Sequence, residues 1–137
     1  MEEYPSKYHK TFEKDRFAKT SGIKLVDAAP GYAKAEMEIR GNHLNSVGVV
    51  HGGAMFTLAD FAFAVASNSH GKLALAINAE ISFFKSVKAG VLTAVAKEIS
   101  LHNRLGTYLI EIQNENSELV AHFKGTVYRK IEAVNFD

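Results

Sequence analysis

The chain has 137 residues and a formal net charge of +1, and 47% of its residues are hydrophobic. This length fits one domain with a core of its own, and the balanced charge argues against nucleic acid as a partner, because phosphate binding requires a basic surface. The sequence contains no cysteine, which excludes disulfides, a thiolate nucleophile and a cysteine-ligated metal. The charged N-terminus lacks the apolar run of a secretory signal, and no stretch reaches the ~20 apolar residues of a membrane span, so a soluble cytoplasmic protein is expected.

The chain is expected to form a single domain without internal repeats. Residues 1–20 form an N-terminal segment with a short helix over residues 6–19. The core follows over residues 22–130, and residues 131–137 are a tail. The expected apolar contacts of the N-terminal helix are Tyr8, Phe12 and Phe17.

The first half of the core predicts two strands and one long helix. The strands turn at Pro30-Gly31, and the second of them alternates apolar and charged residues from Ala33 to Ile39, as a half-solvated strand does. A loop from Asn42 to Val50 leads to an apolar, alanine-rich run from Ala54 to about Ser69. This run contains no proline and favours a buried helix.

The second half predicts strands up to the end of the core. The strand-like segments are Ile77–Phe83, Leu92–Leu101, Thr107–Gln113 and Leu119–Arg129. Short turns between them favour an antiparallel sheet, against which the helix must pack. The predicted fold is therefore of the α+β class, with a curved antiparallel sheet wrapped around one long central helix.

The predicted helix has two different faces. Apolar residues at helical spacing form a stripe for the sheet: Met55, Leu58, Ala59, Ala62, Val65 and Ala66. A second stripe is small and polar: Gly53, Thr57, Asp60, Ala64 and Ser67. Burial of an ionised carboxylate without a partner is costly, yet no lysine or arginine lies between Arg40 and Lys72. Because the helix has too little other polarity for a solvated face, Asp60 is a candidate functional residue.

The glycine pair Gly52-Gly53 stands at the predicted helix start, where backbone N–H groups lack an acceptor within the helix. Such an N–H suits the oxyanion of a carbonyl under attack; the alternative is that the glycines only shape the turn. Gly53 and Asp60 are separated by roughly 10 Å along the helix at 1.5 Å per residue, too far for one carbonyl to contact both. If they cooperate, they come from different subunits of a two-fold dimer.

A family resemblance lies in the stretch HLNSVGVVHGGAMFTLADFAFAVASNS. It resembles the hotdog-fold thioesterases, most closely the phenylacetate-pathway (PaaI-like) acyl-CoA thioesterases, with their pattern N-x-x-G-x-x-H-G-G-x-x-x-x-L-x-D. Later family strands are similar to ISFFKSVKAG and GTYLIEIQN, and the resemblance extends from about Gly22 to Lys130. It implies the hotdog fold, a sheet curved around one central helix.

The resemblance implies roles for four residues. Asp60 matches the acidic residue that acts as general base on water or as nucleophile, and both alternatives stay open. Gly53 matches the glycine whose N–H polarises the thioester carbonyl, and Asn45 matches the asparagine that holds the water or the thioester. His51 matches the histidine beside the oxyanion glycine. Because a helix N-terminus disfavours an imidazolium, it is expected to be a neutral hydrogen-bonding residue, with a general base as the alternative. No water-positioning helper is assigned; Thr57 could serve, or could bond its own backbone instead.

Coenzyme A is implied along the subunit interface as part of the substrate, so no cofactor is expected. Basic loop residues near its phosphates are the candidates Lys85, Lys88 and Arg104, with an ordinary surface charge as the alternative for each. His43 and His51 match no metal-ligand pattern, and no metal is expected.

The predicted reaction converts an acyl-CoA and water into a carboxylic acid and coenzyme A. Phe56, Phe61 and Phe63 are candidates for an apolar cleft that favours an aryl (phenylacetyl-like) or medium-chain acyl group, with core packing as the alternative. Two other classes are an acyl-thioester dehydratase or hydratase and a non-enzymatic acyl-CoA-binding regulatory module. A homo-oligomer is expected: the spacing of Gly53 and Asp60 suggests a dimer as the minimum active unit, and the resemblance implies a tetramer of two dimers.

Overall fold

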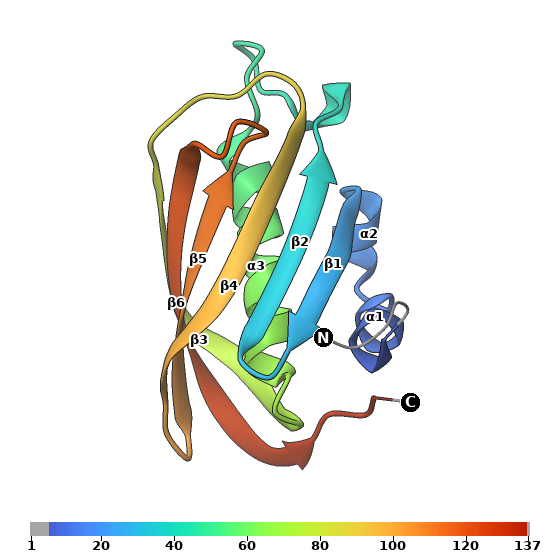
Figure 1. Cartoon of the computed structure of the whole chain (residues 1–137), viewed down its shortest axis with the longest axis vertical. Helices are drawn as coiled ribbons and strands as arrows, with labels where there is room; N and C mark the ends of the chain where they lie inside the picture. Colours follow the sequence, from blue (N-terminus) through green and yellow to red (C-terminus); the bar gives the residue numbers. More distant parts are fainter. Residues whose placement is uncertain (1–5, 137) are drawn as a thin grey trace.

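The structure, a computed structural model, describes residues 6–136. The first five residues of the expected N-terminal segment and the last residue of the expected tail lie outside the described residues. Six antiparallel strands in the order β1-β2-β4-β5-β6-β3 curve around one long helix, α3 (Gly52–Asn68), as Figure 1 shows. The strands are β1 (Ile23–Ala29), β2 (Tyr32–Glu38), β3 (Lys72–Phe83), β4 (Val91–Leu101), β5 (Leu105–Gln113) and β6 (Leu119–Ala133). The expected α+β architecture, a curved antiparallel sheet around a central helix, is confirmed.

Two short helices replace the single N-terminal helix that was expected over residues 6–19. They are α1 (Lys7–Phe12) and α2 (Arg16–Thr20). The Asp15 side chain accepts a hydrogen bond from the backbone N–H of Ala18 at 3.0 Å and so caps the start of α2. A new helix therefore begins at this point. Among the described helices, none is both long and apolar enough to cross a membrane.

The apolar contacts of this segment differ from the expected set at one position. Tyr8 is buried and Phe12 packs against the core, as expected. Phe17 is 71% exposed, so its assignment as an apolar contact is wrong. At the other end of the chain, β6 continues through Ala133, into the segment expected to be a tail.

Small side chains on the inner face of the sheet allow α3 to approach closely. Four fully buried alanines lie on β2 and β4: Ala33, Ala35, Ala94 and Ala96. On the β5–β6 side, the ring of Phe63 packs between those of Tyr108 and Phe123 at centroid distances of 5.9 and 5.6 Å. A Cβ atom on Gly125 would lie only 2.6 Å from the Phe63 ring, so glycine is required for this close approach.

The two edges of the sheet differ in how they are covered. At one edge, α1 and α2 lie beside β1 (Figure 1). At the other edge is β3, which pairs only with β6 among the described strands and carries exposed apolar side chains, including Leu75 and Phe83. The ladder shifts register between Ala76 and Asn78, and the intervening Ile77 is 61% exposed, so the β3–β6 pairing is irregular where the expected strand Ile77–Phe83 begins.

Candidate active site

The loop before α3 is held in shape by Asn45. Its side-chain oxygen Oδ1 accepts hydrogen bonds from the backbone N–H groups of Val47 at 3.0 Å and Val49 at 3.2 Å. A single antiparallel bridge between Leu44 and Val50 closes the loop. Asn45 and His51, which were both predicted to be site residues, therefore flank the same bridge at the entrance to the helix.

His51 is the N-cap residue of α3. Its Nδ1 atom accepts a hydrogen bond from the backbone N–H of Gly53 at 2.8 Å, and both residues are exposed. A ring nitrogen that accepts a hydrogen bond carries no proton, so the imidazole is unprotonated at Nδ1 in this arrangement. A ligand oxygen that takes the Gly53 N–H has to displace the His51 side chain.

Asp60 lies in the middle of α3, two helical turns after Gly53, and is half-buried. Burial raises the pKa of its carboxyl group, and the negative charge of Asp15 raises this pKa further. Among the described residues, no lysine, arginine or histidine forms an ion pair with Asp60. A carboxylate with raised proton affinity and no cationic partner is suited to accept a proton from water.

The stripe of small and polar residues on α3 is shorter than predicted. Thr57 is engaged by its own helix, because its Oγ1 donates to the Gly53 carbonyl at 2.8 Å. Ser67 is 1% exposed, so the stripe is buried at this end of the helix. The accessible part of the stripe runs from Gly53 to Ala64 and has Asp60 as its only ionisable group among the described residues.

The three phenylalanines proposed for an acyl cleft have different surroundings. Phe63 is a core residue, and Phe56 packs edge-on against Phe123 of β6 at a centroid distance of 5.1 Å. Phe61 points to the other side of the helix, where its ring packs edge-on against that of Phe12 of α1 at a centroid distance of 6.3 Å. Only Phe61 of the three borders a pocket of about 600 Å³ between α3, the N-terminal helices and β1.

A smaller hollow of about 340 Å³ lies at the start of α3. It is bordered by Gly52 and Met55 of the helix and by Phe83, Phe84 and Lys85 at the end of β3. The hollow therefore adjoins the helix start that carries the Gly53 N–H.

The three basic residues proposed for coenzyme A phosphates do not gather within one chain. Lys85 and Lys88 lie in the connection after β3, where Lys85 forms an exposed ion pair with Glu118 at 2.9 Å. Arg104 lies in the turn between β4 and β5, at the opposite end of the sheet.

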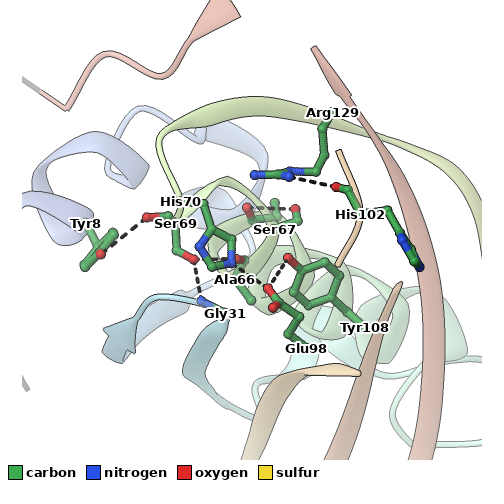
Figure 2. Close-up of polar contacts among 11 residues, drawn as sticks. Tyr8, Gly31, Ala66, Ser67, Ser69, His70, Glu98, His102, Tyr108 and Arg129 are labelled. Atoms are coloured by element: carbon green, nitrogen blue, oxygen red, sulfur yellow. Dashed lines mark hydrogen bonds and ion pairs between the residues drawn. The ribbon is translucent and has the colours of Figure 1, made fainter. Parts of the chain in front are cut away.

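A polar cluster closes the C-terminal end of α3 (Figure 2), and sequence reasoning did not identify it. His70 and Tyr108 both contact the Oε2 atom of Glu98, the tyrosine by donating its hydroxyl at 2.9 Å. Burial and this hydrogen bond raise the pKa of Tyr108. Arg129 is buried nearby and donates to the His102 carbonyl at 2.8 Å. Since the cluster lies at the end of α3 remote from Gly53, we assign it a structural role.

Asp15 bears on the site and was also missed. Aspartate is one of the residues preferred at the N-cap of a helix. The start of α2 after Asp15 could therefore have been recognised in the sequence. The effect of Asp15 on Asp60 could not, because only the packing of α2 against β1 and α3 brings the charge of Asp15 within electrostatic range of Asp60.

Comparisons with known proteins agree with this arrangement. The family model described as Thioesterase superfamily matches residues 47–121. An Archaeoglobus fulgidus protein with an esterase name is 47% identical, over 86% of this chain and 77% of its own length. The Escherichia coli protein named acyl-coenzyme A thioesterase PaaI is 38% identical, over 88% of this chain and 87% of its own length.

Solved structures extend the likeness to the fold. The E. coli PaaI protein from the phenylacetic acid degradation operon superimposes with a TM-score of 0.89 at 35% identity, covering 94% of this chain and 97% of that one. A mutant of the phenylacetic acid degradation protein PaaI from Thermus thermophilus gives a TM-score of 0.82 at 41% identity, covering 85% and 100%. The chain belongs to the thioesterase superfamily and is a PaaI-like thioesterase with the hotdog fold.

Proposed function

We propose that this acyl-CoA thioester hydrolase acts on aryl acyl-CoAs of the phenylacetyl type or on medium-chain acyl-CoAs, in the cytoplasm. Water adds to the thioester carbonyl, the carbon–sulfur bond breaks, and the products are a carboxylic acid and the thiol of coenzyme A. The names of the E. coli relative and of its operon support this substrate class. The proposal rests on the environment of Asp60. Its carboxylate is half-buried, forms no ion pair among the described residues, and lies on the helix whose first turn contains Gly53.

Asp60 acts in its ionised form. As a general base it takes a proton from water while the water oxygen attacks the carbonyl carbon. As a nucleophile it forms an acyl anhydride with the enzyme and releases the thiolate, and water then cleaves the anhydride. Both routes belong to the proposal, and both require an unprotonated carboxylate.

The oxygen of the thioester accepts the Gly53 N–H as negative charge develops on it. The side-chain oxygen of Asn45 is used by the loop, whereas no acceptor among the described residues engages its amide nitrogen. This nitrogen is available to hold the thioester or the attacking water. His51 leaves the Gly53 N–H when the substrate oxygen arrives, and it stays beside the site as a hydrogen-bonding residue.

The spacing along α3 supports a site shared by two subunits. Gly53 and Asp60 are about two turns apart, roughly 10 Å at 1.5 Å per residue, which exceeds the reach of one reacting carbonyl. We propose that Gly53 of one subunit works with Asp60 of the other, and that the two-fold axis generates a second identical site.

The free edge of β3 supports a particular dimer. Two copies of β3 that pair antiparallel would cover its exposed apolar side chains and its unpaired backbone groups. Since α3 begins beside Phe83 and ends beside Ala74, this pairing also makes the two α3 helices antiparallel. Phe56, midway between Gly53 and Asp60, contacts Phe123, which is paired with Ile81. A β3 pair centred near Ile81 therefore suits the shared site.

The same pairing supports the proposed binding of coenzyme A. Within one subunit, Arg104 lies at one end of the sheet and Lys85 and Lys88 lie at the other end. The antiparallel pairing brings the turn with Arg104 of one subunit toward the connection with Lys85 and Lys88 of the other. We assign no cofactor, because hydrolysis transfers no electrons and coenzyme A is part of the substrate. We further propose that two such dimers form a tetramer. Light scattering, which measures the molar mass of the assembly in solution, tests this oligomeric state.

The principal experiment is hydrolysis of an acyl-CoA panel, followed as thiol release. The chain has no cysteine of its own to react with the thiol reagent. We expect Asp60→Asn to lower kcat by ~10²- to 10⁴-fold, while Glu111→Gln, an exposed carboxylate of β5, leaves it unchanged. An Asp60→Asn protein with wild-type activity excludes the assigned role.

A mixing experiment tests the shared site. Gly53→Pro removes the N–H in the first helical turn, where proline is tolerated, and we expect it to inactivate the homo-oligomer. Gly53→Pro and Asp60→Asn chains, unfolded and refolded together, should recover about a quarter of the wild-type activity, since half of the dimers then hold one intact site. A mixture that stays inactive, although light scattering shows dimers, excludes a site shared between subunits.

The other two classes considered from the sequence were a dehydratase or hydratase and a regulatory binding module. The thioesterase family match and the thioesterase name of a relative at 38% identity favour hydrolysis over both.

A further inference from the structure

We infer that the pocket beneath α1 and α2, here called the N-terminal pocket, receives the acyl group of the substrate, so that the N-terminal segment determines acyl size. The inference rests on the proposed function. The pocket measures about 600 Å³, within the ~300–1,000 Å³ typical of small-molecule sites. Its apolar lining comes from six residues: Phe12, Ala18, Ile23, Leu25, Val26 and Phe61.

The pocket begins next to the proposed reaction centre. Phe61, which lines it, is the residue after Asp60 on α3. Asp15 also lines the pocket, and it is close enough to Asp60 for its charge to raise the pKa of that carboxyl. A thioester held with its carbonyl at Asp60 therefore has the pocket within reach of its acyl end.

The direction of the pocket fits the other half of the substrate. Phe56 and Phe61 leave opposite sides of α3, the first toward Phe123 of β6 and the second toward Phe12 of α1. The β6 and β3 side is where the proposed partner subunit and coenzyme A lie. The N-terminal pocket is on the other side, so the acyl group and the leaving thiol point away from each other.

The charges around the pocket favour an uncharged occupant. Besides His9, three acidic and three basic side chains border it: Glu13, Asp15 and Glu36, and Lys19, Lys24 and Arg40. Such a balanced rim lacks the net positive charge that attracts the phosphates of coenzyme A. An apolar lining inside a balanced rim suits a hydrocarbon or aryl group.

Phe12 is the residue that most directly limits the space. It ends α1, a helix of only six residues, and its ring meets that of Phe61 at an interplanar angle of 88°. A substitution at Phe12 therefore changes the volume of the pocket while the sequence of α3 stays intact. Leu25 borders the same pocket from β1 and provides a second, independent position.

The test measures kcat/KM for straight-chain acyl-CoAs of increasing length and for phenylacetyl-CoA. Phe12→Trp and Leu25→Phe narrow the pocket, and we expect each to lower the ratio of long-chain to short-chain activity by about tenfold. Phe12→Ala is expected to raise this ratio. The matched control is Phe17→Ala, which removes an exposed ring of the same segment that does not border the pocket, and it should leave the ratio unchanged.

The possible results separate this inference from the proposed function. If the wild type cleaves acyl-CoAs but folded Phe12 and Leu25 variants keep its chain-length ratio, the pocket does not hold the acyl group. The same conclusion follows if Phe17→Ala changes the ratio as much as they do. If the wild type cleaves no acyl-CoA, the proposed function fails and this inference with it. Circular dichroism identifies folded variants, and Leu25→Phe decides the test if the Phe12 variants do not fold.

Discussion

Gly53 donates its backbone N–H to the Nδ1 atom of His51 at 2.8 Å, so the N–H that the proposed reaction requires is held by the side chain that caps the same helix. A helix start exposes N–H groups that need acceptors. The imidazole supplies one acceptor at the position where a thioester oxygen is proposed to bind. The Gly53 N–H thus has two competing acceptors, the His51 side chain and the proposed thioester oxygen of the substrate.

The capping role of His51 predicts a difference between two substitutions. His51→Ala removes the acceptor and is expected to lower the free energy of unfolding by about 1 kcal/mol. His51→Asn should retain most of that free energy, because asparagine is also a good N-cap. The midpoints of urea unfolding measure both effects. Equal losses in the two variants would contradict a cap that acts through its side-chain acceptor.

Asp60 is expected to lower stability while it supports activity. Because burial raises its pKa above that of the unfolded chain, the ionised form is disfavoured in the fold. The cost is absent below the unfolded pKa, where the group is protonated in both states, grows as the pH rises, and is complete above the folded pKa. At neutral pH, Asp60→Asn should therefore be more stable than the wild type, by on the order of 1 kcal/mol. Thermal unfolding at neutral and acid pH tests this, and the gain should vanish in acid.

Asp15 is expected to shift the pH dependence of hydrolysis. Activity should rise with pH as Asp60 ionises, and the negative charge of Asp15 moves this rise to higher pH. Asp15→Asn removes the charge and keeps a side chain able to cap α2, so the acid limb of the kcat/KM profile should move to lower pH. Glu13→Gln, which neutralises another carboxylate of the same pocket, is the control and should leave the limb in place. An unmoved limb in Asp15→Asn would mean that its charge does not act on Asp60.

Gly125 predicts a packing effect in the core. A Cβ atom there would lie 2.6 Å from the ring of Phe63, which is itself enclosed by Tyr108 and Phe123. Gly125→Ala forces this ring to move and should cost ~1–3 kcal/mol of unfolding free energy. Gly41→Ala is the matched control, since a Cβ atom at Gly41 would meet nothing within 4 Å. Chemical denaturation distinguishes the two, and equal values would show that the core accommodates the added methyl group.

The architecture could be predicted because the main signals are local. The long apolar run without proline specifies α3 within two residues at its start, and the turn at Pro30-Gly31 separates β1 from β2 as expected. The strand expected from Ile77 begins earlier, at Lys72, and its register shift at Ile77 depends on the pairing of β3 with β6. The burial of Ser67 likewise depends on which elements pack around the end of α3. These outcomes follow from tertiary contacts that a single strand or helix pattern does not contain.

The site could be predicted only as a set of residue types. The resemblance identifies Asn45, His51, Gly53 and Asp60 as the candidates, and their roles remain predictions. The hydrogen bond between His51 and Gly53 arises from the geometry of the cap, and the nearness of Asp15 to Asp60 arises from the packing of α2. Both require a folded chain. Neither follows from a sequence motif.

The free edge of β3 has a consequence for how much of this protein a cell must make. Under the proposed pairing, the folded form is favoured by association, so its stability rises with the concentration of the chain. A newly synthesised copy presents the unpaired edge beside Leu75 and Phe83, and β3 carries only Lys72 and Glu80 as charges against pairing with a wrong strand. Scarce chains meet one another more rarely than they meet other proteins. Near the dissociation constant of the dimer, halving synthesis would therefore remove more than half of the assembled enzyme.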